Sequence, residues 1–572
     1  MKKNKLFFKV LTLLIVFYSF GIQKLKAQDN SGTEFWFTIF AETYIDHLPG
    51  VYIVSYYDCQ VTIDYVARDP ALDIAGDPDC TKHTVNVTGG VPLYVDIPYD
   101  LQAICWRYAD DIAVPETVQL SGIKVTSTAP IALYSQFIAV ASSEMTPILP
   151  IEEMGLEYIV TAYREITDPA NEFNARTTVV GIEDNTSITF TLPSYAWTSS
   201  TNANGTMTHG PNSSWSITLN KGETYTVLSN DNGQALAATP AGSSVTVNNN
   251  QGLNGMKITA NKIISVLGGT DCTWTGNDEY PGCGACDLTC THLKPVEKWD
   301  TRYVSTQTLQ RSNQMSLAVG LASPPTPNIV PYPANFNQLS VADYLLITAK
   351  DNATTVNITG QFNYTKNLNA GEWFIYESPG NSNPLTPPPT TSPGMTNHVI
   401  ESNNPVQVTQ MMKGWQCDNN NPADPTQMLV IEENMWRDNY IVTNPTQYAN
   451  NFFVFIVKEP LGGNQARNSL NLNVNGLNIP IPTGNSPTND GTGGWSQMGT
   501  TEPYYYQRVN IAAGGAIKAK SVPLVLGGTT YPFAFYASGS TNASSYGYMG
   551  GNVCKLEAYA HADTANICLG DP

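Results

Sequence analysis

The sequence repeats itself four times, and this repeat constrains the fold more than any other feature. Each copy begins with an aromatic segment: EFWFTIF (34–40), EYIVTAY (157–163), RYVSTQT (302–308) and NYIVTNP (439–445). A hairpin-like segment follows, and then an apolar residue with a glycine three positions later. These glycines are Gly90, Gly222, Gly371 and Gly514. The repeat predicts four copies of one building block.

Apolar and polar residues alternate within most of the short segments. In SITFTLP, Ile188, Phe190 and Leu192 fall on one face of an extended chain. A period of two indicates a strand with one buried face. Asp184-Asn185 and Asp351-Asn352 mark hairpin turns, and the repeated glycine permits positive φ in the next turn. We expect an all-β protein.

Each copy ends in what we interpret as two strands flanking a short turn. Pro130, Pro405 and Pro523 occupy one equivalent position there, and Lys262 occupies it in the remaining copy. Proline has no N–H to donate to a neighbouring strand, so it is tolerated at the first residue of a strand.

These patterns divide the chain into a signal peptide and four tandem antiparallel units of about six to eight strands each. The predicted bounds are 1–27 for the signal peptide, 28–155 for unit 1, 156–300 for unit 2, 301–437 for unit 3, 438–556 for unit 4 and 557–572 for the tail. Because no linker separates the units, we expect sandwich-like units that pack together. Closure into a β-propeller of seven four-stranded blades is the alternative. The tail resembles the start of an immunoglobulin- or PKD-like module.

The first residues predict export. Lysines precede an apolar run over residues 10–22, and Ala27 offers a small residue for cleavage. No later segment has the length of about 18 apolar residues that a membrane span needs, so we expect no membrane span after cleavage. The net charge of −19 argues against a nucleic-acid partner.

The ten cysteines all follow the predicted signal, and an exported chain meets an oxidising environment. We therefore predict disulfides among Cys59, Cys80, Cys105, Cys272, Cys283, Cys286, Cys290, Cys417, Cys554 and Cys568. Zinc is the alternative for Cys272, Cys283, Cys286, Cys290 and His292. Only one CxxC occurs, and a zinc ribbon uses two such knuckles. No metal or cofactor is therefore predicted.

Two sets of residues are candidates for ligand contact. Glu152, Glu297 and Glu432 recur before three aromatic segments. They suit either a repeated ligand or calcium site or, as we favour, carboxylates that accept backbone N–H groups at a strand start or pair with a basic neighbour. The aromatic candidates are Trp274, Trp415, Tyr504, Tyr505 and Tyr506. Alternation should expose at least one of the three consecutive tyrosines, although we favour a core-capping role for the two tryptophans.

Catalysis finds little support in the sequence. Neither a G-x-S-x-G elbow nor an H-E-x-x-H helix occurs. No catalytic residue is predicted, although the two carboxylates of a glycosidase can lie on separate strands without a sequence signature.

Several segments, in order, resemble the IgGFc-binding protein N-terminal domain family. They are GTEFWFTIF, GIKVTSTAPIALYS, LPIEEMGLEYIV, EDNTSITFTL, LNKGETYTV, CDLTCTHLKPVEKW, AKDNATTVNI, LNAGEWF, NPVQVTQMM and SSYGYMGG. The likeness covers residues 31–552, and the family occurs in many secreted bacterial proteins. Members carry a cysteine-rich segment before the Pro-x-Glu motif, so the resemblance favours disulfides over zinc.

Together these observations predict a secreted or outer-surface, non-enzymatic binding or adhesion protein. A rigid β scaffold would present the loops 196–215, 272–292, 377–397 and 482–502 to an extracellular protein or glycan. A structural role in displaying further modules is the first alternative, and a glycan-active enzyme is the second.

Overall fold

The computed structural model describes most of the chain that follows the predicted signal peptide. The described residues are 31–40, 49–66, 82–97, 102–103, 115–139, 142–162, 174–199, 207–229, 252–273, 275, 287–308, 329–330, 343–360, 363–377, 397–412, 425–445, 448, 450–459, 463–486, 493–499, 501–511, 514–525, 528–541, 544–549, 559–561 and 564–566. Nearly all strand pairs in them are antiparallel, which confirms the all-β prediction.

The first unit shows the strand order that the others repeat. Its strands are β1 (Ser31–Phe37), β3 (Gly50–Val54), β4 (Cys59–Asp64), β5 (Lys82–Val87), β6 (Leu93–Asp96), β9 (Ile123–Ala139) and β10 (Ser142–Ile148). The first half of β9 pairs with β1 and β4, and its second half pairs with β3 and β10. In β4, Val61 and Ile63 are buried whereas Gln60 is exposed, as the alternation predicts.

The second and third units have the same connections. Unit 2 contains β11 (Gly155–Ile159), β12 (Ala175–Gly181), β13 (Thr186–Thr191), β15 (Ser214–Leu219), β16 (Thr224–Ser229), β17 (Lys257–Thr273) and β18 (Asp287–His292). Unit 3 contains β19 (Asp300–Ser305), β21 (Tyr344–Ala349), β22 (Thr354–Gly360), β23 (Tyr364–Leu368), β24 (Trp373–Glu377), β25 (His398–Met412) and β26 (Thr426–Leu429). The strands β17 and β25 take the place of β9.

One prediction about the strands is wrong. The two strands expected around Pro130, Lys262 and Pro405 are a single long strand in each of the first three units: β9, β17 and β25. The pairing of each long strand with its aromatic strand shifts register near these residues. A strand can therefore pass through a proline where the ladder is already interrupted.

Unit 4 keeps the topology but breaks the long strand. It contains β27 (Asn439–Asn444), β28 (Asn450–Lys458), the short helix α2 (Gln465–Ser469), β29 (Leu470–Val474), β30 (Leu477–Ile479), β32 (Tyr504–Ile511), β33 (Gly515–Ser521), β34 (Phe533–Thr541) and β35 (Ser544–Met549). The strands β33 and β34 replace the two halves of a long strand. Pro523 lies in the connection between them and starts no strand.

Short elements flank these sheets. The short strands are β2 (Ile39–Phe40), β7 (Gln102–Ala103), β8 (Val118–Gln119), β14 (Thr198–Ser199), β20 (Ile329–Val330), β31 (Ser496–Gln497), β36 (Tyr559–His561) and β37 (Thr564–Asn566). Three 3-10 helices, η3 (Ile151–Glu153), η5 (Val296–Lys298) and η7 (Glu433–Met435), precede the aromatic strands of units 2, 3 and 4.

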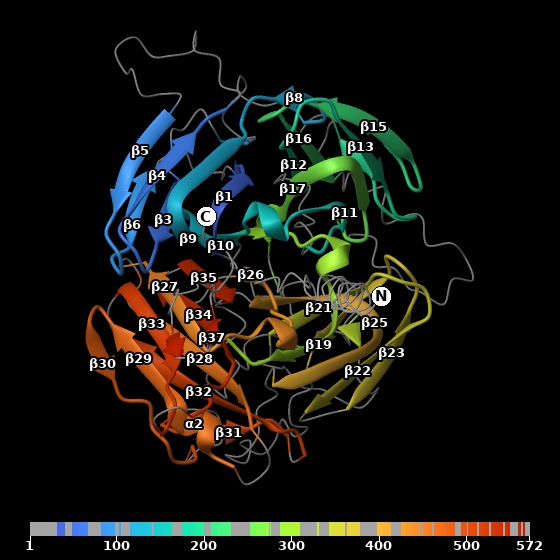
Figure 1. Ribbon diagram of the computed structural model, residues 1–572. Helices are drawn as coiled ribbons and strands as arrows, with labels where there is room; N and C mark the ends of the chain where they lie inside the picture. Colours follow the sequence, from blue (N-terminus) through green and yellow to red (C-terminus); the bar gives the residue numbers. More distant parts are fainter. Residues whose placement is uncertain are drawn as a thin grey trace, which may run out of the picture.

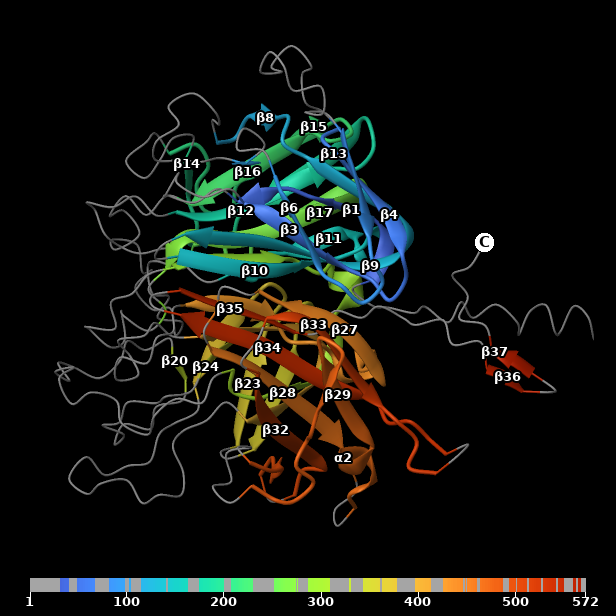
Figure 2. The same cartoon turned by 90° about the vertical axis from the view of Figure 1, so that its left-hand side faces the viewer.

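The four units form a closed ring (Figure 1). At its centre, the inner strand β10 lies against β18 and β35, and β26 lies against the same two strands. The last unit therefore contacts the first, and the side view shows the units packed directly against each other (Figure 2). The ring has the closure of the propeller alternative, with four large units instead of seven blades. The bounds between units stay a prediction.

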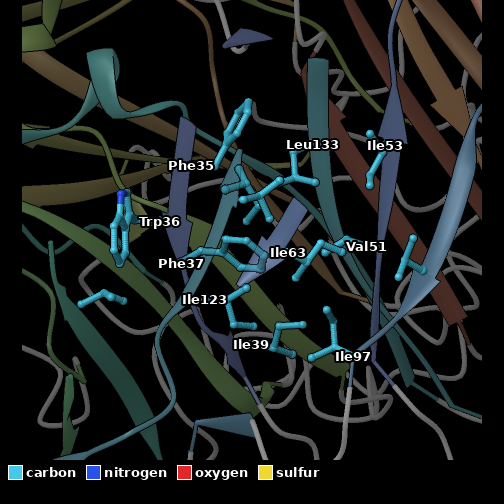
Figure 3. Packing of buried hydrophobic residues seen from close by; sticks show 14 of the residues in the cluster. Phe35, Trp36, Phe37, Ile39, Val51, Ile53, Ile63, Ile97, Ile123 and Leu133 are labelled. Carbon is cyan, nitrogen blue, oxygen red and sulfur yellow. The ribbon is translucent and has the colours of Figure 1, made fainter. Parts of the chain in front are cut away.

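Hydrophobic cores fill the units and cross their boundaries. In unit 1, Phe35, Phe37 and Ile123 pack with Ile63 and Leu133 from both halves of the sheet (Figure 3). A second cluster lies entirely within residues 158–293 of unit 2. Unit 4 divides its apolar side chains between a cluster shared with unit 1 and a cluster shared with unit 3.

A tyrosine near the start of the aromatic strand joins the two halves of the sheet in units 2, 3 and 4. The Tyr158 hydroxyl accepts the Gly155 N–H at 3.0 Å and donates to the Ile264 carbonyl at 2.7 Å. Tyr303 and Tyr440 make the equivalent pair of bonds. Phe35 occupies this position in unit 1, so the first unit holds its halves together without a hydroxyl.

The repeated glycine turn behaves as predicted in three units. Gly90, Gly222 and Gly371 have φ values of 79°, 80° and 77°. Two of these turns also meet the preceding unit closely, because a Cβ on Gly122 would lie 2.4 Å from the Gly222 carbonyl oxygen and one on Gly255 would lie 2.9 Å from that of Gly371. The glycines therefore permit both the turn and the approach of neighbouring units.

Candidate functional site

The centre of the ring is polar, buried and built from the inner strands. The Ser142 hydroxyl and the Ser143 N–H, at 2.9 Å, both donate to the Asp287 carboxylate and so join β10 to β18. Glu144 receives the Thr426 hydroxyl at 2.8 Å and the Gln427 N–H at 3.3 Å, which joins β10 to β26. Both carboxylates act here as acceptors between units.

Burial controls the ionisation of the central groups. It raises the pKa of Glu144 well above the usual range, and hydrogen bonds from Thr426 and from backbone N–H groups oppose this only in part. It also lowers the pKa of His292 to about 3. The two ring nitrogens of His292 face the Leu149 N–H and the Ser265 hydroxyl at 3.0 Å each, so this histidine is neutral and fixed.

The three recurring carboxylates lie at the 3-10 helices but are not equivalent. Glu152 and Glu297 are exposed within η3 and η5, and Glu297 accepts the Leu156 N–H at 3.1 Å. Glu432 is buried at the N-cap of η7, where η3 and η5 have proline. The surroundings of Glu432 therefore differ from those of the other two, although all three precede an aromatic strand.

Glu432 instead forms a buried ion pair with a lysine of the neighbouring unit. The Lys294 ammonium lies 2.5 Å from its carboxylate, and the two side chains are 7% and 1% exposed. Glu153, also buried, lies 3.5 Å from Lys298. Burial raises the pKa of Glu153, and the two lysines partly offset this effect. The charges at these junctions are paired with each other, which is a structural role.

Two of the ten cysteines have described side chains. Cys59 and Cys290 are buried and neither is in a disulfide, so the disulfide prediction is wrong at these two positions. Cys290 faces a packed core, and burial raises the pKa of its thiol. The side chains of Cys80, Cys105, Cys272, Cys283, Cys286, Cys417, Cys554 and Cys568 lie outside the described residues.

The alternative zinc site included Cys290 and His292, and both are engaged in the ring centre. No group of three or more metal-binding side chains occurs among the residues that the structure describes.

The expectation that one of three consecutive tyrosines is exposed is also wrong. Tyr504, Tyr505 and Tyr506 are 0%, 8% and 2% exposed. Tyr505 packs into the core shared with unit 1, and the other two pack into the core shared with unit 3. Strand β32 has a core on both faces, so alternation exposes neither side. Trp274 and Trp415 lie outside the described residues.

The predicted loops are described only in part. Residues 287–292 of the loop 272–292 form the buried strand β18, so that segment presents nothing to solvent. The described parts of 196–215 and 482–502 include β14 and β31. Nearly all of 377–397 lies outside the described residues.

The most exposed apolar segment was missed by the sequence analysis. Val522, Leu524 and Val525, between β33 and β34, are 37%, 53% and 69% exposed. The repeat pattern instead predicts the final strand of unit 4 in this segment. A sequence signal for this difference exists, because the aromatic segment FAFYASGST, which forms β34, begins ten residues after Pro523.

A comparison with protein families shows the family of this chain. Residues 144–539 match the model of the family described as IgGFc binding protein. The chain belongs to the IgGFc-binding family. This match covers well over half of the chain and runs from β10 to β34. Unit 1 has the same strand order although nearly all of it precedes the matched segment.

Two further findings bear on this family member. A comparison with curated proteins finds no match. In the part of the chain that the structure describes, none of the helices has the length and apolar character that crossing a membrane requires.

Proposed function

We propose that the chain is a secreted or cell-surface binding protein that recognises an extracellular partner through loops on a rigid β ring. Membership of a binding-protein family supports a binding role. Shared cores between neighbouring units support rigidity, because separating the units would expose large apolar side chains. Loops on such a scaffold lose little conformational entropy on binding.

The observation that carries this proposal is the apolar segment around Leu524. In units 1, 2 and 3 the chain passes through the equivalent point as a continuous strand. Unit 4 alone departs from the strand there and places three apolar side chains in solvent. Such a departure from a repeat, at the cost of apolar exposure, is typical of an interaction site.

The base of this segment is held in place by hydrogen bonds. The Val522 N–H donates to the Ser469 carbonyl at 2.7 Å, and the Tyr531 N–H donates to the Ser521 hydroxyl at 2.8 Å. A third bond runs from the Gly528 N–H to the Val525 carbonyl at 2.9 Å. The segment is therefore prepared for binding before a partner arrives.

The chemistry of the segment favours a protein partner over a glycan. Exposed aliphatic side chains are typical of surfaces that bind proteins, because they gain free energy when a partner covers them. The described part of the segment contains no exposed aromatic ring.

Binding measurements on the chain from Gln28 to Pro572 test the proposal. We expect the protein to bind at least one component of a panel of purified extracellular proteins, IgG Fc included, and Leu524→Asp to weaken that binding at least tenfold. Leu477→Asp is the matched control, because Leu477 is 71% exposed on the β29–β30 hairpin of the same unit. Equal binding by both variants would exclude this segment. Binding only on a glycan array would replace the protein partner, and binding to nothing would favour a display role.

A further inference from the structure

Strand β15 forms an outer edge of the unit 2 sheet. It pairs with β13 on one side, and no strand of the described chain pairs with its other side. The strand lies at the outer rim of the ring (Figure 1). An unpaired edge presents backbone N–H and C=O groups to any extended chain that approaches it, and natural proteins block such edges with charges, prolines or short strands.

The corresponding edge strands of the other units are blocked. In unit 1, β5 begins with Lys82 and His83. In unit 3, Lys366 lies in the middle of β23. In unit 4, β30 has only three residues, and Pro480 follows it. Strand β15 differs from all of these, because its six residues, SWSITL, include neither a charge nor a proline.

Units 2 and 3 show this difference at a single position. Strands β15 and β23 end at Leu219 and Leu368, and each leucine pairs with the first threonine of its hairpin. Two residues earlier, β15 has Ile217 where β23 has Lys366, and both side chains are half-buried. An added strand would desolvate the lysine, whereas it would give the isoleucine new apolar contacts.

The backbone of β15 directs hydrogen-bonding groups outward at three alternating positions. The Leu192 N–H donates to the Ser213 carbonyl at 3.0 Å, so the odd-numbered residues of β15 bond to β13. Ser214, Ser216 and Thr218 therefore direct their N–H and C=O groups away from β13. The side chains of these three residues are exposed.

We propose that β15 pairs antiparallel with β15 of a second copy of this chain, about a two-fold axis at Ser216. In this register the strand is complementary to itself. Ser216 meets Ser216 of the second copy, and Ser214 meets Thr218. Hydroxyl groups already face each other within the hairpin, where Thr189 lies 2.8 Å from Ser216 and Thr191 lies 3.1 Å from Ser214. The second copy extends this pattern.

The other face of the strand is complementary as well. Trp215 would pack beside Ile217 of the second copy, and an aromatic ring next to a β-branched side chain is a favourable cross-strand pair. Phe190 and His209 stack on Trp215 with ring centroids 5.2 and 3.8 Å away, so the ring is fixed before pairing.

The charge distribution favours an identical edge as the occupant. The whole chain has a net charge of −19, which opposes self-association at most places on its surface. Residues 207–220 contain no Asp, Glu, Lys or Arg, so two copies can meet at β15 without local repulsion. Pairing would join two sheets into one and remove both exposed edges. This inference does not depend on the proposed binding role.

Sedimentation equilibrium of the chain from Gln28 to Pro572 tests the pairing. We expect a monomer–dimer equilibrium for the native chain. Ser216→Lys places two like charges opposite each other at the axis and should weaken dimerisation at least tenfold, and Ser216→Asp should do the same. An equimolar mixture of the two variants should recover the dimer, because opposite charges then meet.

Thr365→Lys is the matched control, because Thr365 takes the place of Ser216 on β23, and it should leave the equilibrium unchanged. Circular dichroism checks that each variant folds. If the Ser216 variants do not fold, Ile217→Lys, which copies the edge of unit 3, should abolish the dimer. A native chain that stays monomeric at all accessible concentrations would overturn the proposal. So would a dimer that the charged variants retain, or a mixture with no more dimer than either variant alone.

Discussion

Units 2 and 4 share one topology but obtain their stability differently. Unit 2 has one core drawn only from residues 158–293. On its other face, Val180, Leu267 and Leu288 join the core of unit 1. Unit 4 has its strand β32 between two cores, one shared with unit 1 and one with unit 3. Units with the same strand order can therefore differ in how much their cores depend on neighbouring units. Unit 4 stabilises both of its neighbours and closes the ring.

The largest expected effects come from removing one phenylalanine from each type of core. Phe190→Ala in unit 2 and Phe455→Ala in unit 4 should each cost about 3–5 kcal/mol, because both side chains are completely buried. We expect hydrogen exchange to rise only in unit 2 for the first variant. For the second it should rise in unit 4 and also in β3 and β9 of unit 1. An effect of Phe455→Ala confined to unit 4 would remove the distinction.

A smaller effect is expected at the seam between units 1 and 2. Gly122→Ala places a methyl group against the Gly222 backbone, which cannot rotate away, and should cost about 1–3 kcal/mol in urea unfolding. Gly484→Ala is the matched control, since its Cβ would meet nothing within 4 Å, and it should stay within about 0.5 kcal/mol of the native chain. Equal values would show that the seam is looser than the structure indicates.

Removing a single hydroxyl from unit 2 or unit 4 should lower the free energy of unfolding by a smaller amount. Tyr158→Phe and Tyr440→Phe each leave a buried carbonyl and N–H without their bridge, which costs about 1–2 kcal/mol. Tyr440 belongs to the core shared with unit 1, so its loss should also speed exchange in unit 1. Phe35 shows that the position tolerates phenylalanine sterically. No change in either variant would mean that the bridge contributes nothing.

The smallest expected effect is a change in pH dependence at the centre, which belongs to no single unit. Burial raises the pKa of Glu144 in the folded chain, so the folded state binds a proton that the unfolded state releases above its ordinary carboxyl pKa. This contribution to stability is complete in acid and is lost as the pH rises through the raised pKa. Glu144→Gln should therefore match the native chain in acid and exceed its stability at alkaline pH. Parallel pH profiles of the two proteins would contradict this assignment.

The sequence predicted what depends on local periodicity. The alternation in SITFTLP and the glycine three residues after an apolar position both reflect backbone geometry, and β13 and Gly222 follow it. The burial of Glu432 could not be predicted, because the sequence does not show that Glu432 is the N-cap of η7, where η3 and η5 have proline.

Contacts between distant segments explain the other misses. A polar–apolar alternation in the sequence predicts a strand with one buried and one exposed face. Strand β32 instead has two buried faces, because Tyr505 packs into the core shared with unit 1 and Tyr506 into the core shared with unit 3. The buried ion pair of Lys294 with Glu432 joins residues 138 positions apart on two units, and no motif marks it. The ring itself arises from contacts between β10 and β35, about 400 residues apart.

Ring closure by unit 4 is the central claim, and a photo-crosslink tests it most directly. The Tyr56 hydroxyl of unit 1 donates to the Asn439 side chain at 2.6 Å, and the Lys518 ammonium lies 6.0 Å from the centre of the Tyr56 ring. With benzoylphenylalanine in place of Tyr56, mass spectrometry should find crosslinks within one molecule to peptides that contain residues 439 and 518. Crosslinks only to units 2 or 3, or only between molecules, would contradict a closed ring.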